Sequence, residues 1–292
     1  MKSTGRRLAV TAACVVLAAG SSGLLSSAQG AAAPRQTIAV PAYIYPSDNA
    51  WGKLHNPAPG AGLIVANPAS GPGTGRDPAY AEAIRDAHDA GKKVIGYVDT
   101  GYFGTTGWAV PGTDDSSTSA WMDAVKENVD SWYRLYGDSG VGGIFFDDAL
   151  NDCGPSSGST AHVDLYEEIQ AYVKSKDPAA HVAANPGTHP DECYADAADT
   201  LVTFEGSYAQ YEDWSPSSWE TAVAPSKIWH LVYETDQSRM PGAISLSKDR
   251  NAGYVYVTDD DNTPVDGLPW GNPWDTLPPD AYWSAEVAAA GE

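Results

Sequence analysis

Eight short runs of apolar, β-branched and aromatic residues recur along the chain. Each run is apolar almost throughout instead of alternating with polar positions, which is typical of parallel strands that are covered on both faces. We therefore predict eight buried parallel strands, at residues 37–45, 62–67, 93–99, 143–148, 181–185, 201–205, 227–233 and 252–258.

The segments between these runs carry apolar residues at helical spacing. The clearest segment lies between Trp121 and Tyr136, and the same spacing recurs at residues 80–87 and 163–173. Such a pattern predicts amphipathic helices whose apolar faces pack on the strands. Strands that alternate with helices favour an α/β fold, a single-domain (β/α)8 TIM-type barrel. A doubly wound open sheet is the alternative.

The first thirty residues have the pattern of a secretory signal peptide. Lys2, Arg6 and Arg7 precede an apolar stretch at residues 8–25, and the small residues 26–30 follow at the spacing of a cleavage site. A single membrane anchor is the alternative, although glycines and serines interrupt the stretch. We expect a secreted, extracellular protein whose catalytic domain spans residues 31–292.

The charge of the chain excludes some partners. The sequence has 17 Lys and Arg against 38 Asp and Glu, a formal net charge of −21. A surface of this sign repels phosphate, so nucleic acids and anionic membranes are poor partners, whereas a neutral or cationic polymer is not repelled. We expect a monomer with a polysaccharide substrate.

Two cysteines, Cys153 and Cys193, remain after removal of the signal peptide. In an exported chain, two cysteines most simply form one disulfide. Two metal-binding thiolates are the alternative, but the chain lacks the CxxC or neighbouring His pattern of zinc sites. The sequence therefore predicts a disulfide between them.

Candidate chemistry lies where the predicted strands end, because the catalytic groups of such barrels stand at the carboxyl ends of the strands. Any single polar residue there can be a helix cap or a solvated loop residue. Asp147, Asp148 and Glu205 together favour function, since apolar strands bring all three to one mouth. The polar strand ends are Asn67, Asp99, Asp147–Asp148, Asn185, Glu205, Tyr233–Glu234 and Asp259–Asp260.

Paired carboxyls suit the cleavage of glycosidic bonds, which needs one acid and one carboxylate. The sequence contains no HExxH, GxxxxGK[ST] or GxSxG motif, and its histidines show no paired spacing. Asp259–Asp261 could hold calcium but departs from the EF-hand pattern. We expect no cofactor and no catalytic metal. Four tryptophans in loop-like stretches could stack on sugar rings: Trp108, Trp214, Trp270 and Trp274.

The order of several motifs resembles the spherulation-specific family 4, or spherulin-4-like, proteins. The motifs are VPAYIYP (40–46), NPASGPG (67–73), GYVDTGY (96–102), GIFFDD (143–148), NPG (185–187) and FE (204–205). The resemblance implies a (β/α)8 glycoside hydrolase, and characterised fungal relatives cleave an N-acetylgalactosamine-containing polysaccharide, galactosaminogalactan. The family's acids fall on Asp147, Asp148 and Glu205. The chain departs from the family at Asp148, where Glu is common, and at Phe103, which interrupts the usual Tyr-Gly.

The paired carboxyls lead us to expect a glycoside hydrolase, and the resemblance implies an endo-acting one whose exopolysaccharide substrate contains N-acetylgalactosamine or galactosamine. Asp147 would be the nucleophile or base, Glu205 the general acid and Asp148 an orienting group, although either of the first two could take either role. A non-catalytic carbohydrate-binding or cell-surface protein and a metal-dependent deacetylase remain alternatives. The expected substrate-binding residues are Tyr43, Asn67, Asp99, Asn185, Tyr208 and Tyr233.

Overall fold

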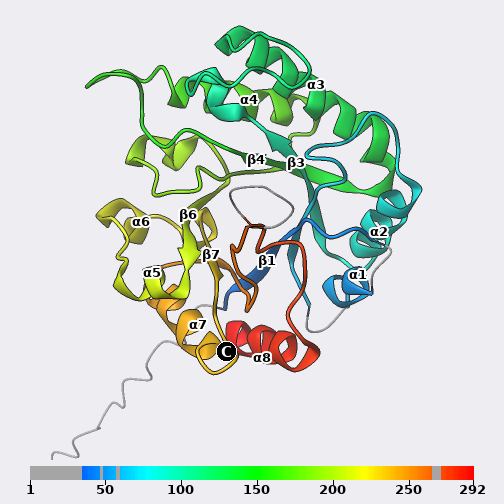
Figure 1. Cartoon of the computed structure of the whole chain (residues 1–292), viewed down its shortest axis with the longest axis vertical. Helices are drawn as coiled ribbons and strands as arrows, with labels where there is room; N and C mark the ends of the chain where they lie inside the picture. The colour runs from blue at the N-terminus through cyan, green and yellow to red at the C-terminus, as the bar shows by residue number, and fades with distance from the viewer. Residues whose placement is uncertain (1–34, 47–48, 57–59, 265–270) are drawn as a thin grey trace, which may run out of the picture. The chain divides into compact units, whose positions relative to one another are not determined.

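The computed structural model describes residues 35–46, 49–56, 60–264 and 271–292. The strands in this part of the chain form one closed barrel in which each pairs in parallel with its neighbours in sequence and the last pairs with the first (Figure 1). This confirms the predicted (β/α)8 fold. The strands are β1 (Thr37–Ala42), β2 (Leu63–Ala66), β3 (Lys93–Asp99), β4 (Val141–Asp147), β5 (His181–Ala184), β6 (Thr200–Ser207), β7 (Ile228–Tyr233) and β8 (Tyr254–Val257).

Helices surround the strands as an outer ring (Figure 1). Their buried residues face the barrel, as the helical spacing predicts; in α3 these include Trp121, Val125 and Trp132. After β5 the connection holds only the short 3-10 turn Glu192–Asp196. The helices are α1 (Ala50–Leu54), α2 (Pro78–Asp89), α3 (Thr118–Tyr136), α4 (Val163–Lys176), α5 (Tyr208–Asp213), α6 (Ser218–Ala222), α7 (Met240–Asp249) and α8 (Asp280–Gly291).

Aromatic side chains fill the interior of the barrel. The ring of Phe145 lies 6.3 Å from that of Tyr97 and 5.5 Å from that of Trp229, and Trp229 in turn packs 6.5 Å from Tyr254. Phe145 and Trp229 are fully buried. The barrel is therefore a packed core without a pore, so a ligand can reach it only at its ends.

Two β-bulges determine which way the acidic strand ends face. In β4, Gly142 and Gly143 stand opposite the single residue Ile95 of β3, and in β6 Thr203 is an extra residue relative to β7. An extra residue reverses the alternation of side chains beyond it. Asp147 and Glu205 follow these two bulges, so the bulges decide whether their carboxyls face the barrel mouth.

The Glu286 carboxyl of α8 completes the seam between β1 and β8. The last residue pair between these strands is Ile38 with Val255, and beyond it the Val257 amide donates to Glu286 Oε1 at 2.8 Å. Glu286 is fully buried, and burial raises its pKa well above the usual range. This acid therefore replaces a missing strand partner and serves the fold.

Among the described residues, no helix is long and apolar enough to cross a membrane. The predicted signal peptide, residues 1–30, lies outside the described residues. Secretion and the domain boundary at residue 31 therefore stay predictions.

The bulge in β4 depends on Gly143, whose φ is +157° and whose hypothetical Cβ would lie 1.9 Å from the His181 carbonyl oxygen. We predict that Gly143→Ala lowers the free energy of unfolding by roughly 2–4 kcal/mol, since strands β4 and β5 must separate to admit a methyl group. Denaturant unfolding measures this. Gly137→Ala is the control, because no atom lies within 4 Å of its Cβ position. Equal stability of the two variants would contradict the account of the bulge.

Candidate active site

A cleft of about 840 Å³ opens at the carboxyl ends of the strands. Its lining comes from the ends of β1, β3, β4, β6 and β7, from the loops after β2, β3 and β5, and from Asn262 and residues 271–274 in the connection between β8 and α8. Asp147, Asp148 and Glu205 all line it. The three acids that the sequence singled out are therefore brought together in one cavity.

Asn185 lies between Asp147 and Glu205 and binds both. Its Nδ2 donates to Asp147 Oδ1 at 2.9 Å and to Glu205 Oε2 at 2.7 Å. The Gly187 amide donates to Asn185 Oδ1 at 2.9 Å, which fixes the side-chain orientation with its NH2 toward the acids. Because the two N–H bonds of an amide diverge at about 120°, the bridged carboxyl oxygens lie about 5 Å apart.

Glu205 is surrounded by groups that can only donate hydrogen bonds. Besides Asn185, the indole Nε1 of Trp274 donates to Glu205 Oε1 at 3.0 Å. Burial raises the pKa of Glu205, and the two donors oppose that rise because they stabilise the ionised form. A proton on Glu205 would displace favourable donors, so this site favours a carboxylate.

Asp147 has a different environment. Burial, and then the negative charge of Glu205, raises the pKa of Asp147 well above its usual range. The Tyr43 hydroxyl donates to Asp147 Oδ2 at 3.4 Å, and a hydrogen bond from Tyr97 to the same carboxyl lowers its pKa and opposes part of that rise. A phenol hydroxyl can accept as well as donate, so a protonated Asp147 has an acceptor nearby. The single proton of the pair is thus placed better on Asp147 than on Glu205.

Asp148 stands on the wall of the cleft. Its φ is +50°, a left-handed conformation that is held by hydrogen bonds to Tyr102: the Tyr102 amide donates to Asp148 O and the Tyr102 hydroxyl to Asp148 Oδ1, both at 2.9 Å. Asp99 lies next to Asp148. Burial, and then the negative charge of Asp148, raises the pKa of Asp99 to about 6, and burial raises the pKa of Asp148.

Four of the six expected substrate-binding residues line the cleft: Tyr43, Asn67, Asn185 and Tyr233. Asp99 is absent from the lining and acts on the cleft through Asp148. Asn67 Oδ1 already accepts from the Gly71 amide at 2.9 Å, so its carbonyl side supports the loop after β2.

Tyr208, the other expected residue, is not among the described residues that line the cleft. Ser207 ends β6 and caps α5 by accepting from the Gln210 amide. The chain therefore enters a helix at Tyr208, whose ring packs 5.8 Å from the Arg239 guanidinium in the outer ring of helices. A strand-end position next to a helix cap directs the side chain away from the barrel mouth.

Sequence reasoning missed Tyr97 and Tyr102 as contacts of the acids. Tyr97 lies two residues before Asp99 in β3 and so shares its face, a signal that the period of the strand could have supplied. Tyr102 has no such signal, because it lies in a left-handed turn (residues 101–104) with φ of +52°, +51°, +48° and +72°. Trp274, which could stack on a sugar ring, lines the cleft, and its indole Nε1 also donates a hydrogen bond to Glu205.

The other loop tryptophans have separate positions. Trp108 lines the cleft, whereas Trp214 packs 5.2 Å from His230 and 5.1 Å from Phe204 outside it. Trp270 lies outside the described residues.

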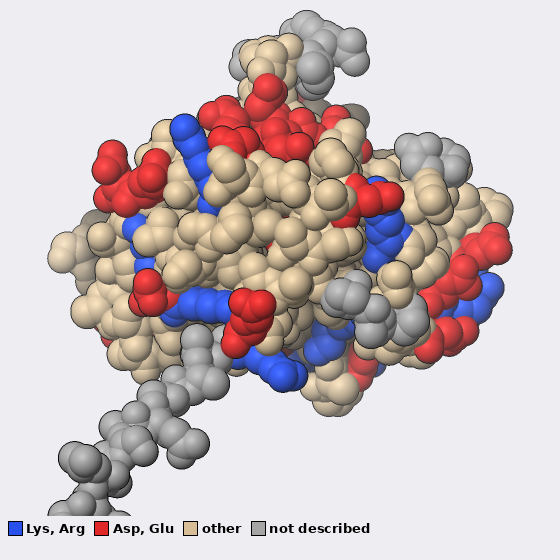
Figure 2. All heavy atoms as spheres, turned by 90° about the horizontal axis from the view of Figure 1, so that it is seen from below, with Lys and Arg blue, Asp and Glu red and all other residues tan. Residues whose placement is uncertain are grey.

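No Lys, Arg or His is among the described residues that line the cleft. Basic side chains gather at the ends of helices and the starts of strands, on the opposite side of the barrel, for example Lys174, Lys176 and Lys227. Figure 2 shows a group of acidic side chains along the upper edge, whereas acidic and basic side chains are interspersed over the rest of this face. The acids in the cleft therefore lack a protein counter-charge.

Within the described ranges, no group of three or more His, Cys, Asp and Glu side chains is arranged to hold a metal ion. In the Asp259–Asp261 segment, Asp260 Oδ2 accepts from the Thr276 hydroxyl at 2.6 Å and Asp261 Oδ1 from the Thr263 amide at 2.8 Å. These carboxylates hold the long loop after β8.

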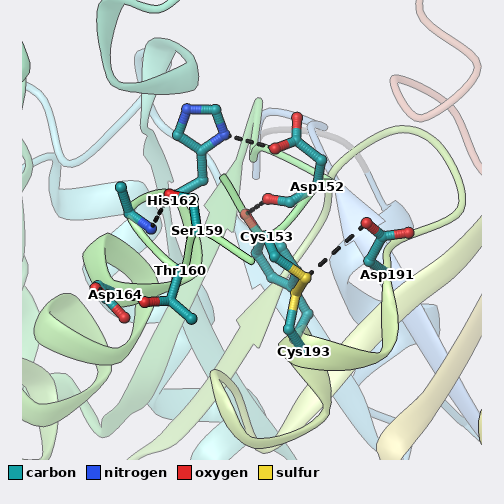
Figure 3. Close-up of a disulfide and its surroundings, with 10 residues drawn as sticks. Asp152, Cys153, Ser159, Thr160, His162, Asp164, Asp191 and Cys193 are labelled. Atoms are coloured by element: carbon teal, nitrogen blue, oxygen red, sulfur yellow. Dashed lines mark hydrogen bonds and ion pairs between the residues drawn. A yellow bond between two sulfur atoms is a disulfide. The ribbon is translucent and has the colours of Figure 1, made fainter. Parts of the chain in front are cut away.

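The predicted disulfide between Cys153 and Cys193 is present, with Cα atoms 5.9 Å apart (Figure 3). It joins the loop after β4 to the 3-10 turn after β5, so it lies on the side of the barrel that carries the cleft. His162 Nδ1 and Asp152 Oδ1, 2.7 Å apart, pair beside it (Figure 3). The Asp191 amide also donates to Asn151 O at 2.8 Å. The bond therefore braces two loops whose strands carry Asp147 and Asn185.

We predict that a reductant lowers the melting temperature of the protein, since the disulfide closes a loop of 40 residues. The lost stability should be roughly 2–4 kcal/mol. The Cys153→Ser, Cys193→Ser double variant is the control, and its melting temperature should be low and unaffected by the reductant. A wild-type protein with two free thiols would contradict the pairing.

The chain is a (β/α)8-barrel protein, and Asp147 and Glu205 lie in the cleft at the C-terminal ends of its strands. Proteins of this fold carry their active sites at that face. Residues 37–290 match the model of spherulation-specific family 4, and the chain belongs to this family. The family that the sequence motifs suggested is thereby confirmed.

Solved structures share the fold. The crystal structure of Aspergillus clavatus Sph3 in complex with GalNAc superposes with a TM-score of 0.68 at 20% identity, covering 89% of this chain and 98% of that one. A family 39 glycoside hydrolase from Bacteroides cellulosilyticus WH2 has a TM-score of 0.52 at 12% identity, over 88% of this chain and 64% of its own. Among curated proteins, no sequence matches this chain.

Proposed function

We propose that this protein is a secreted, endo-acting glycoside hydrolase that cleaves an exopolysaccharide containing N-acetylgalactosamine or galactosamine. The observation that carries the proposal is the pair Asp147 and Glu205, which share one amide donor in unequal surroundings. The GalNAc in the complex with Sph3, which has the same fold, supports an amino sugar as the ligand. We infer endo action from the cleft of about 840 Å³, which lies at the barrel mouth and is open to solvent.

The hydrogen bonds favour Glu205 as nucleophile and Asp147 as general acid, the reverse of the division expected from sequence. Glu205 is held as a carboxylate, and Asp147 keeps the proton. Asp147 would protonate the leaving oxygen while Glu205 attacks the anomeric carbon. Water activated by Asp147 would then release the sugar. Carboxyl oxygens about 5 Å apart suit this double displacement and net retention of configuration.

The neighbours of the pair have positioning roles in this mechanism. Asn185 and Trp274 hold Glu205, while Tyr43 and Tyr97 hold Asp147. The negative charge of Asp148 adds to the burial and to the charge of Glu205 in raising the pKa of Asp147. Asp148 thus helps to keep the acid protonated, consistent with the orienting or tuning role expected for it.

A non-catalytic carbohydrate-binding protein on the same fold is the competing function. Two carboxyls that share one buried amide donor repel each other when both are ionised, which destabilises the fold. Such costly arrangements are typical of catalytic sites, so the pair favours an enzyme over a binding protein. A metal-dependent deacetylase, the other alternative, would lose its activity to a chelator. Release of reducing sugar from an amino-sugar polymer distinguishes hydrolysis from both alternatives.

We predict that Asp147→Asn and Glu205→Gln each lower kcat/KM by roughly 10³-fold or more, because each removes an ionisable group and nearly preserves shape. Asp249→Asn, an exposed acid at the end of α7, is the matched control and should keep wild-type activity. EDTA should leave the activity of the wild type unchanged. Near-normal turnover by both cleft variants would place the active site elsewhere.

Azide rescue tests the division of roles. With an activated glycoside, Asp147→Ala plus azide should give a glycosyl azide with the substrate's configuration, because azide then attacks the covalent intermediate. Glu205→Ala plus azide should give the opposite configuration, because azide replaces the nucleophile. NMR of the products decides between the assignments. Exchanged outcomes would restore the division expected from sequence, and an inverted product from the wild type would exclude double displacement.

Trp274→Phe should move the acidic limb of the kcat/KM profile to higher pH by about one unit. The indole donor stabilises ionised Glu205, so its loss raises the pKa of Glu205 and a higher pH is needed to form the nucleophile. Trp214→Phe, outside the cleft, is the control. An unmoved limb, or a shift to lower pH, would show that Trp274 does not hold the ionised form.

A further inference from the structure

One wall of the cleft exposes a tryptophan that packing does not explain. Among the described residues, the large hydrophobic side chains that are exposed are Trp108 and Tyr45, at 51% and 49%. Trp108 lines the cleft, whereas Tyr45 does not and its hydroxyl donates to Asp77 at 3.2 Å. An exposed indole in a concave site offers a face on which a sugar ring can stack.

Trp108 is held in place before any ligand binds. Its carbonyl accepts from the buried Trp121 Nε1 at 2.8 Å, which ties the loop to α3. The ring of Tyr102 packs edge-on against it, with centroids 5.7 Å apart. A fixed aromatic face loses little conformational entropy on binding. The wall therefore has the properties of a preformed subsite.

The aromatic wall ends at a carboxyl. Tyr102, which packs on Trp108, also donates its hydroxyl to Asp148 Oδ1 at 2.9 Å. Asp148 lines the cleft as well, and its carboxyl shares a hydrogen bond with that of Asp99. The three residues Trp108, Tyr102 and Asp148 thus form one continuous surface, which we term the aromatic wall.

No basic side chain among the described lining residues balances the acids of this cleft. Carboxylates that are partly removed from water are costly unless a positive charge accompanies them. A ligand with an ammonium group supplies that charge, and it can also interact with an aromatic face. An acetamido group brings no charge, so it gains only the stacking and hydrogen bonds.

We propose that the aromatic wall is a subsite for a hexosamine ring with a free, protonated amino group, with the ring on Trp108 and the ammonium facing Asp148. This inference deepens the proposed function and rests on it for the polymer class. It does not depend on which acid of the catalytic pair is the nucleophile. It assigns the enzyme a preference for de-N-acetylated stretches of the polysaccharide over fully acetylated ones.

Calorimetric binding to Glu205→Gln protein, which prevents turnover, tests the preference. The probes are oligosaccharides of galactosamine and of N-acetylgalactosamine of equal length, at a pH near 6.5, where acids and amine can both be charged. We expect the free-amine oligomer to bind about tenfold more tightly, a difference that falls with added salt. Equal affinity, or tighter binding of the acetylated oligomer, would overturn the proposal.

Substitutions in the same background locate the effect. Trp108→Ala should weaken binding of both oligomers about tenfold, whereas Tyr45→Ala, equally exposed but outside the cleft, should change neither. Asp148→Asn should weaken only the free-amine oligomer and so remove the preference. Asp114→Asn, which makes the same charge change in the exposed loop after β3, should leave the preference intact. If Asp148→Asn weakens the binding of both oligomers equally, or if Asp114→Asn removes the preference, Asp148 does not bind the ammonium group.

Turnover by the wild-type protein separates this inference from the proposed function. Hydrolysis of acetylated and free-amine polymers at equal kcat/KM would support the proposed glycosidase activity and refute the subsite preference. Tight binding of the free-amine oligomer without any hydrolysis would do the opposite, because it would support the subsite and refute the enzyme.

Discussion

The site depends on one constraint, which is that two carboxyl groups are held against the two hydrogens of a single amide. Asn185 can bridge Asp147 and Glu205 only because the Gly187 amide occupies its oxygen and orients its NH2. Ionising both carboxyl groups at this distance costs free energy, so the pair tends to keep one proton. The donor-only surroundings of Glu205 and the tyrosine hydroxyls around Asp147 then make the two acids chemically different.

The barrel supplies the geometry for this constraint. A parallel sheet closed on itself brings all carboxyl ends to one mouth, and the bulges at Gly142–Gly143 and Thr203 orient the acids into it. Below them the aromatic side chains of Phe145, Trp229 and their neighbours fill the interior of the barrel. Above them, the disulfide and the loops after β4 and β5 fix the rim.

The electrostatics of the cleft extend the same argument to the substrate. Its lining holds three acids and, among the described residues, no cation. The catalytic pair can accommodate its charge by sharing a proton. Asp148 and Asp99 form a second pair of carboxyls joined by a hydrogen bond. A cationic ligand group at the aromatic wall would compensate the negative charge that this second pair keeps. The surface with a net negative charge favours the approach of such a ligand.

The sequence by itself determined the strands, the acids that end them and the cysteine pair, because burial on both faces and strand-end position leave their mark in local residue patterns. Only the tertiary structure decided how these groups act. The bond from Trp274 to Glu205 spans 69 residues and that from Tyr43 to Asp147 spans 104. Asn185 was recognisable as a strand end but not as a bridge, and Tyr208 turned outward with α5. A contact between distant residues depends on where the chain closes in space, and local spacing carries no record of that.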